Sequence, residues 1–105
     1  MSNAKTINRM KEPNLKIKRR KVTFSLQAKE ADRVVLVGDF NNWDPKVHPM
    51  KNAGDGMWSK TVMIPAGTYE YKFLVDGTWC LDPRNAQTCP NCFGTYNNIC
   101  DLIEA

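Results

Sequence analysis

The sequence has one histidine, His48, and no segment in which apolar residues recur with a helical period. It also has no apolar run long enough to span a bilayer, and no signal-peptide pattern at its start. A histidine without an evident partner offers no nucleophile–base pair for hydrolysis. These absences disfavour helical folds, membrane-spanning proteins and hydrolases of the Ser-His or Cys-His type. With 105 residues, the chain has room for one domain.

Positive charge is concentrated at one end of the chain. Residues 1–21 hold eight Lys or Arg and one acid, a net charge of +7, whereas the remaining residues carry a net charge of −3. We therefore expect residues 1–20 to form a disordered basic tail, in part an expression-vector remnant (Ser2-Asn3-Ala4), and residues 21–105 to form the domain. Such a tail either contacts acidic surfaces or is simply solvated. The negative body disfavours nucleic acid as a partner, and no membrane partner is expected.

The pattern of short β-rich segments predicts an all-β protein. Apolar and polar residues alternate over 22–27, and a β-branched run covers 34–40. Further strands are expected over 57–64, 69–75, 78–81 and 98–103, with a loop over 84–92. About seven short strands separated by turn signals are typical of an immunoglobulin-like antiparallel β-sandwich.

The clearest local signal is the hairpin centred on Asp76-Gly77. Both residues tolerate the positive φ that a type I′ turn requires. This turn places Leu74 opposite Trp79 and Phe73 opposite Cys80, so Lys72 and Trp79 share one face of the sheet. We expect that face to be solvated. A tryptophan beside a lysine there indicates a binding surface or, alternatively, a ring that only covers the sheet edge.

No catalytic residue is assigned. Asp76 belongs to the turn, Asp44 and Asp82 precede prolines, and Asp55 lies between glycines. No two carboxylates are evidently placed to flank a bond, as glycoside hydrolysis would require. We expect a noncatalytic protein that needs no cofactor.

The four cysteines leave three alternatives open. Without a signal peptide, a reduced cytoplasmic setting is expected. Cys89-Pro90-Asn91-Cys92 has the spacing of a zinc knuckle, and Cys80 and Cys100 could complete a site. However, the strand patterns place Cys80 and Cys100 on the core face, where a thiol behaves as a small apolar group. A redox pair or disulfide of Cys89 and Cys92 is the third alternative.

Aromatic and polar residues form the most informative constellation. Trp43 is expected on a loop and Trp79 on a sheet face, whereas Trp58 lies within a strand and is expected to be structural. A sugar ring stacks its apolar face on indole, and its hydroxyl rim takes hydrogen bonds. The candidate hydrogen-bonding side chains are Asn41, Asn42, Lys72, Thr95, Asn97 and Asn98.

Four motifs in this order resemble one family. They are Gly38-Asp39-Phe40-Asn41-Asn42-Trp43, the segment 65–79, Asp82-Pro83, and Gly94-Thr95-Tyr96-Asn97-Asn98-Ile99. Residues 35–102 resemble the glycogen-binding domain of the AMP-activated protein kinase beta subunit, and more broadly carbohydrate-binding module family 48, which includes N-terminal domains of isoamylases and branching enzymes. The resemblance implies a site for α-1,4-linked glucan such as glycogen or starch.

The resemblance also implies roles for individual residues. Trp43 and Trp79 would stack on sugar, and Lys72, Thr95 and Asn97 would bind hydroxyls. Phe93 occupies the position of a leucine that reaches through the curved sugar chain in the kinase domain, and the Cys-Pro-Asn-Cys loop is a second departure. The expected partner is an α-glucan or maltooligosaccharide, together with a glycogen-metabolising enzyme or a kinase. The alternatives are a protein-interaction or regulatory domain that has lost sugar binding, and an accessory domain of a glycogen-active enzyme.

Overall fold

The computed structural model describes residues 18–102. Residues 1–17 of the tail that is expected over residues 1–20, and the last three residues of the chain, lie outside this range. Among the described residues, one 3-10 turn, η2 (Asp39–Asn41), is the only helical element, and no helix is long and apolar enough to cross a membrane. The strands are β2 (Arg19–Gln27), β3 (Val34–Gly38), β4 (Lys51–Asn52), β5 (Met57–Pro65), β6 (Gly67–Val75), β7 (Thr78–Cys80), β8 (Thr88–Pro90) and β9 (Tyr96–Leu102).

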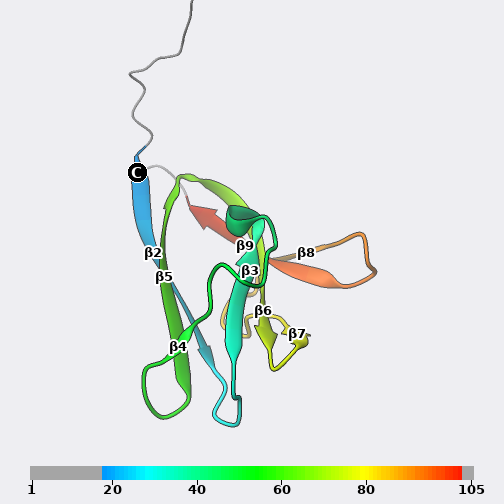
Figure 1. Ribbon diagram of the computed structural model, residues 1–105. Coiled ribbons are helices and arrows are strands. Elements are labelled where there is room, and N and C mark those ends of the chain that lie inside the picture. Colours follow the sequence, from blue (N-terminus) through cyan, green and yellow to red (C-terminus); the bar gives the residue numbers. More distant parts are fainter. Residues whose placement is uncertain (1–17, 103–105) are drawn as a thin grey trace, which may run out of the picture.

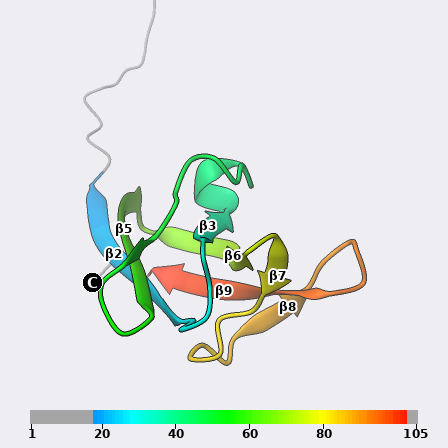
Figure 2. The same ribbon diagram turned by 60° about the horizontal axis from the view of Figure 1, so that its bottom comes forward.

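The strands form two antiparallel sheets that pack as a sandwich, as the sequence predicts (Figure 1). One sheet has the order β2-β5-β4. The other has the order β3-β6-β9-β8, with β7 paired to β6 as well. Figure 2 shows β6, β9 and β8 side by side, and the β8–β9 loop extends beyond the body of the sandwich.

Several boundaries differ from the sequence prediction. Strand β2 begins at Arg19, so Arg19 and Arg20 belong to the sheet and not to the tail, because they pair with Pro65 and Ile64 of β5. The run expected to continue to residue 40 leaves the sheet after Gly38 and turns into η2. The expected loop over 84–92 contains strand β8, because residues 88–90 pair with residues 96–98 of β9.

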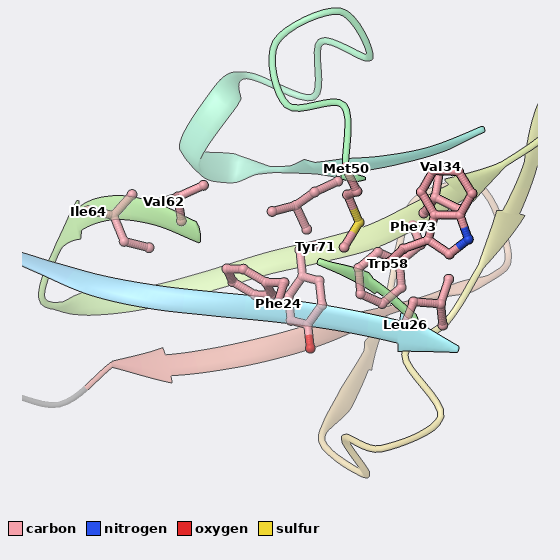
Figure 3. Packing of buried hydrophobic residues seen from close by; sticks show 10 residues of the cluster. Phe24, Leu26, Val34, Met50, Trp58, Val62, Ile64, Tyr71 and Phe73 are labelled. Atoms are coloured by element: carbon pink, nitrogen blue, oxygen red, sulfur yellow. The ribbon is translucent and has the colours of Figure 1, made fainter. Parts of the chain in front are cut away.

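The core lies between the sheets and is built from alternate residues of the long strands (Figure 3). Phe24 packs edge-on against Tyr71, with ring centroids 4.8 Å apart, and Phe73 is fully buried. Trp58 is buried as expected, and its indole nitrogen donates to the carbonyl of Ala28 at 3.0 Å. Burying each such side chain contributes about 1.5–3 kcal/mol, so the core fixes which face of β6 points outward.

The β6–β7 hairpin has the predicted register. Leu74 pairs with Trp79 and Phe73 with Cys80, and Asp76 and Gly77 have φ of 48° and 83°. The Asp76 carboxylate also accepts hydrogen bonds from the backbone N–H groups of Asp32 and Arg33, at 3.0 and 2.8 Å. The turn is therefore tied to the loop before β3, which holds Trp79 in a defined place beside β6.

Candidate functional site

A groove of about 860 Å³ lies on the outer face of the five-stranded sheet. The loop after β3, the β6–β7 hairpin and the β8–β9 segment supply its walls. It brings together the six residues to which the resemblance assigns a position at the sugar, and adds four others. The lining residues are Trp43, Glu70, Lys72, Trp79, Pro90, Asn91, Cys92, Phe93, Thr95 and Asn97.

Two tryptophans form an angled aromatic wall. The ring centroids of Trp43 and Trp79 are 6.4 Å apart and their planes meet at 62°. Trp79 lies on β7 and is 48% exposed, so its indole is not buried in the core and is available to a ligand. The structure thus presents two apolar ring surfaces that are not coplanar.

Trp43 is held in place by Asp39. The indole nitrogen of Trp43 donates to Asp39 Oδ1 at 2.9 Å, and Asp39 Oδ2 accepts the backbone N–H of Glu70 at 2.7 Å. Gly38 is required for this close approach, because a Cβ there would lie 2.6 Å from the carbonyl oxygen of Glu70. The Gly-Asp pair before the aromatic loop therefore docks that loop on β6.

Lys72 lies on the predicted face, but its side chain is less exposed to solvent than expected. The residue is buried at 8% exposure, and its ammonium group donates to Thr95 Oγ1 at 3.2 Å. Among residues 18–102 the Thr95 hydroxyl is its one hydrogen-bond partner. An ammonium group has three N–H donors, so two of them are available to acceptors in the groove.

Asn91 organises the polar side of the groove. Its amide nitrogen donates to Thr95 Oγ1 at 2.8 Å and to Asn97 Oδ1 at 2.9 Å. Its amide oxygen accepts the backbone N–H groups of Phe93 and Thr95. Asn97 in turn donates to Glu70 Oε1 at 3.0 Å. One side chain thereby holds two of the expected hydrogen-bonding residues, Thr95 and Asn97.

Asn91 and Glu70 are residues that the sequence reasoning did not assign. Gly94 lies three residues after Asn91 and has a φ of 81°. An Asn-x-x-Gly spacing of this kind is a turn signal. That signal indicates a turn but not the contacts to Thr95 and Asn97, which depend on the β8–β9 pairing. For Glu70, the sequence pattern predicts only that its side chain faces outward from the strand.

Phe93 lies at the tip of the same loop and is 85% exposed. Its backbone is held by Asn91, while its ring lines the groove. A large aromatic ring exposed to this degree is unusual for a residue with only a structural role.

Two of the candidate polar residues belong to the scaffold and not to the groove. The Asn41 side chain is buried and bonds the Gly38 N–H, the Leu36 carbonyl and His48 Nδ1. Asn98 is fully buried and accepts the N–H of Asp82 at 2.7 Å. Their polar groups are used within the fold, so they are not available to a ligand.

The cysteines do not gather into a metal site. Within residues 18–102 no three His, Cys, Asp or Glu side chains are grouped so that they could hold a metal ion, and all four thiols are free. Cys100 packs against the core as predicted, and Cys80 is half-buried. Partial burial, followed by the hydrogen bond to Glu70 and its negative charge, raises the pKa of the Cys89 thiol. Cys92 is exposed and lines the groove.

The groove has a single carboxyl group among its ten lining residues, that of Glu70. That group accepts the Asn97 amide and is not placed opposite a second acid across the groove. The lining is instead aromatic on one side and hydrogen-bonding on the other, which suits binding of a molecule with apolar faces and polar edges.

The chain is similar in sequence to several known proteins. The chain is 36% identical over 66 residues to the 5'-AMP-activated protein kinase subunit beta-2 of Homo sapiens, a match covering 63% of this chain and 23% of that protein. It is 42% identical over 53 residues to Protein PTST homolog 2, chloroplastic, of Arabidopsis thaliana, covering 50% of this chain and 10% of that protein. It is 37% identical over 54 residues to the 1,4-alpha-glucan branching enzyme GlgB 2 of Xanthomonas campestris pv. campestris (strain 8004), covering 51% of this chain and 7% of that protein.

The matches therefore span less than a quarter of each of these relatives. The family model described as the glycogen recognition site of AMP-activated protein kinase matches residues 21–105, which is most of the sequence. The chain belongs to this family of glycogen-recognition carbohydrate-binding modules.

Proposed function

We propose that the chain binds α-1,4-linked glucan, such as glycogen, starch or a maltooligosaccharide, in the groove between Trp43 and Phe93. The observation that carries the proposal is Lys72, a residue of 8% exposure that lines the groove and whose ammonium group has one protein acceptor among residues 18–102. A buried charged group is normally fully hydrogen-bonded. Lys72 lines a groove whose other wall is aromatic, and a sugar ring requires both hydrogen-bond donors and an aromatic surface.

The angle between the aromatic rings favours a curved chain. Successive residues of an α-1,4-linked glucan turn relative to one another, whereas a β-1,4-linked chain is extended and flat. Trp43 and Trp79, with planes 62° apart, would each stack on a different sugar of a curved ligand. Lys72, Thr95 and Asn97 would bind hydroxyl groups, and Phe93 would contact the chain at the loop tip.

The role that follows is noncatalytic tethering of a polysaccharide, with no cofactor. The relatives named for a protein kinase subunit and a glucan branching enzyme favour a glycogen-related enzyme or kinase as the protein whose substrate or location is affected. The four free thiols favour a reducing, cytoplasmic setting.

The test is a fluorescence titration with maltoheptaose, with cellohexaose as the control ligand. We expect a saturable change in tryptophan emission with the α-linked sugar only. If neither sugar produces a change, the proposal fails and the protein-interaction alternative takes its place.

Trp79→Ala supplies the residue-level test. Because Trp79 is exposed, this variant should fold and lose most of its sugar affinity, by about tenfold or more for the loss of one stacked ring. Met63→Ala is the matched control, since Met63 is 53% exposed on the other sheet and does not line the groove. A Trp79→Ala protein that unfolds contradicts the structural placement, and one that binds normally contradicts the stacking role.

A further inference from the structure

Strand β2 is a long outer strand that, within residues 18–102, is paired on one side only. It has nine residues, and β5 is its single partner strand in that range. The other outer strands are short or covered. Strands β4, β7 and β8 have two or three residues each, and β3 is hydrogen-bonded on its second side to residues 48–50. Because an unpaired edge presents backbone N–H and C=O groups, β2 is the place where a further strand would add.

There is room for a strand beside β2. A cleft of about 420 Å³ runs along residues 22–25, and its other wall comes from β9 and from the connection between β7 and β8. Residues 22–27 contain neither proline nor a charged residue, two devices that natural proteins place on exposed edges to prevent pairing. The middle of β2 is therefore open to pairing both in space and in sequence.

The two ends of β2 differ in charge. Residues 18–21 are four consecutive cations. At the other end, Gln27 donates to the carbonyl oxygen of Asp55 at 2.8 Å, and the connection over residues 28–33 together with Asp55 holds three acids and two cations. Two parallel copies of β2 would oppose their basic ends. Antiparallel copies instead place the basic end of each strand beside the more acidic end of the other.

An antiparallel pair of β2 strands is also matched in its side chains. A two-fold axis perpendicular to the sheet keeps inward-facing residues opposite inward-facing residues only if it passes through a residue. The middle residue of β2 is Thr23. With the axis there, the opposed residues are Arg19 and Gln27, Arg20 and Leu26, Lys21 and Ser25, Val22 and Phe24, and Thr23 and its own copy. No cation of one strand then lies directly opposite a cation of the other.

We propose that β2 is a dimerisation edge, at which a second copy of this chain adds its own β2 antiparallel about a two-fold axis through Thr23. The two three-stranded sheets then become one sheet of six strands. None of the residues that line the groove belongs to β2, so both grooves of the dimer stay open.

The dimer has a consequence for the proposed function and, in this part alone, rests on it. A polysaccharide offers many sites on one molecule, so after one groove has bound, the second groove binds the same molecule at a high effective concentration. Dimerisation should therefore raise the apparent affinity for glycogen. It should leave the affinity for maltoheptaose, a short ligand held in one groove, unchanged.

The experiment measures the sedimentation velocity of the full chain from micromolar to millimolar concentration, together with amide hydrogen exchange. We expect a reversible equilibrium between monomer and dimer. Exchange of the amides of residues 22–27 should slow as the dimer forms, because the added strand supplies acceptors to that edge.

Charge substitutions at Ser25 test the register. Ser25→Lys places a cation opposite Lys21 of the second copy and should weaken the dimer roughly fivefold, since each dimer contains two such pairs. Ser25→Glu should strengthen the dimer by a similar factor, and the double variant Lys21→Glu with Ser25→Lys should restore it. Thr68→Lys, which adds the same charge to an exposed position of β6 outside the groove, is the matched control and should change nothing.

The sugar readouts separate the two proposals. Across these variants the glycogen affinity should follow the dimer, while the maltoheptaose affinity stays constant. A chain that remains monomeric, or a dimer that does not respond to charge at Ser25, overturns the inference and leaves the proposed function standing. A dimer that forms only after residues 1–17 are removed also overturns it, because that segment would then be the occupant of the edge. A dimer that does not bind maltoheptaose overturns the proposed function instead.

Discussion

At the scale of single residues, Asn91 illustrates a side chain that acts through its neighbours. It donates to Thr95 and Asn97 and accepts from the backbone at Phe93 and Thr95, so it fixes three groove residues. We predict that Asn91→Ala lowers maltoheptaose affinity by about tenfold, corresponding to about 1.4 kcal/mol of lost preorganisation. Calorimetric titration measures the change.

The control for that variant is Asn52→Ala. Asn52 also stabilises a turn, through the Gly54 N–H at 2.9 Å, but it lies in the other sheet and outside the groove. It should reduce stability slightly without changing sugar affinity. Equal affinities for Asn91→Ala and the unmodified chain would show that the network does not position the ligand-binding groups.

His48 provides a second prediction at this scale. Burial, and secondarily the positive charge of Lys60, lowers its pKa from 6.5, and its Nδ1 accepts the Asn41 amide when the ring is neutral. The unfolded chain therefore takes up a proton near pH 6.5 more readily than the folded chain. The contribution of neutral His48 to the free energy of unfolding is fully present above pH 6.5. It is lost as the pH drops from 6.5 through the lower pKa of His48 in the folded state.

Urea unfolding at pH 7.5 and at pH 5.5 measures this loss. His48→Gln should remove the part of the pH dependence that lies just below pH 6.5, since His48 is the single histidine. An unchanged dependence in that variant would assign the effect to the carboxyl groups instead.

At the scale of elements, the β6–β7 hairpin shows what a sequence can predict. Its turn, register and faces follow from Asp76-Gly77 and from alternation, which are local properties. The burial of Lys72 does not follow from them, because it depends on Thr95, which comes from a different hairpin. Strand β8 was missed for the same reason: three residues ending in a proline carry almost no pattern of their own, and only their pairing with β9 defines them.

The same limit applies to the candidate site. The motifs supply Trp43, Lys72, Trp79, Phe93, Thr95 and Asn97, and the fold places all of them in one groove. They do not separate Asn97 from Asn98, although one lines the groove and the other is fully buried. The side on which a strand residue faces is decided by the register of the completed sheet, and the last strand begins at Tyr96, two residues before the predicted start.

Asp76 gives the prediction for this scale. Its carboxylate ties the hairpin turn to the backbone of Asp32 and Arg33, and its φ is 48°. Asp76→Ala should lower the free energy of unfolding by about 2 kcal/mol, because it loses these acceptors and places alanine in the left-handed region. Asp76→Asn should cost less, since asparagine tolerates this conformation and keeps one acceptor.

Urea denaturation compares the two variants. The hairpin carries Trp79, so sugar affinity should fall with stability in the alanine variant and recover partly in the asparagine variant. Equal stabilities for the two substitutions would mean that neither the backbone conformation nor the carboxylate contacts hold the turn.

At the scale of the whole molecule, the distribution of charge along the chain distinguishes two classes of ligand that stack on aromatic rings, single-stranded nucleic acid and glucan. Residues 1–21 carry a net charge of +7 and the rest of the chain −3, so a polyanion would be attracted mainly to the N-terminal segment and not to the groove. Binding of single-stranded nucleic acid releases counterions and weakens steeply with salt. A neutral glucan exchanges hydrogen bonds and apolar contact with the groove and releases no ions.

We therefore predict that the maltoheptaose dissociation constant changes by less than about twofold between about 50 mM and 500 mM sodium chloride, because long-range charge interactions are screened over this range and contribute nothing to a neutral ligand. Removing residues 1–17, which precede the described range, should leave that constant unchanged as well. An oligonucleotide serves as the comparison: any affinity for it should fall with salt and be reduced by the same truncation, which removes four of the eight Lys and Arg residues of the segment 1–21. A sugar affinity that falls with salt in parallel with the oligonucleotide would mean that the N-terminal segment takes part in binding, and that the groove alone does not account for recognition.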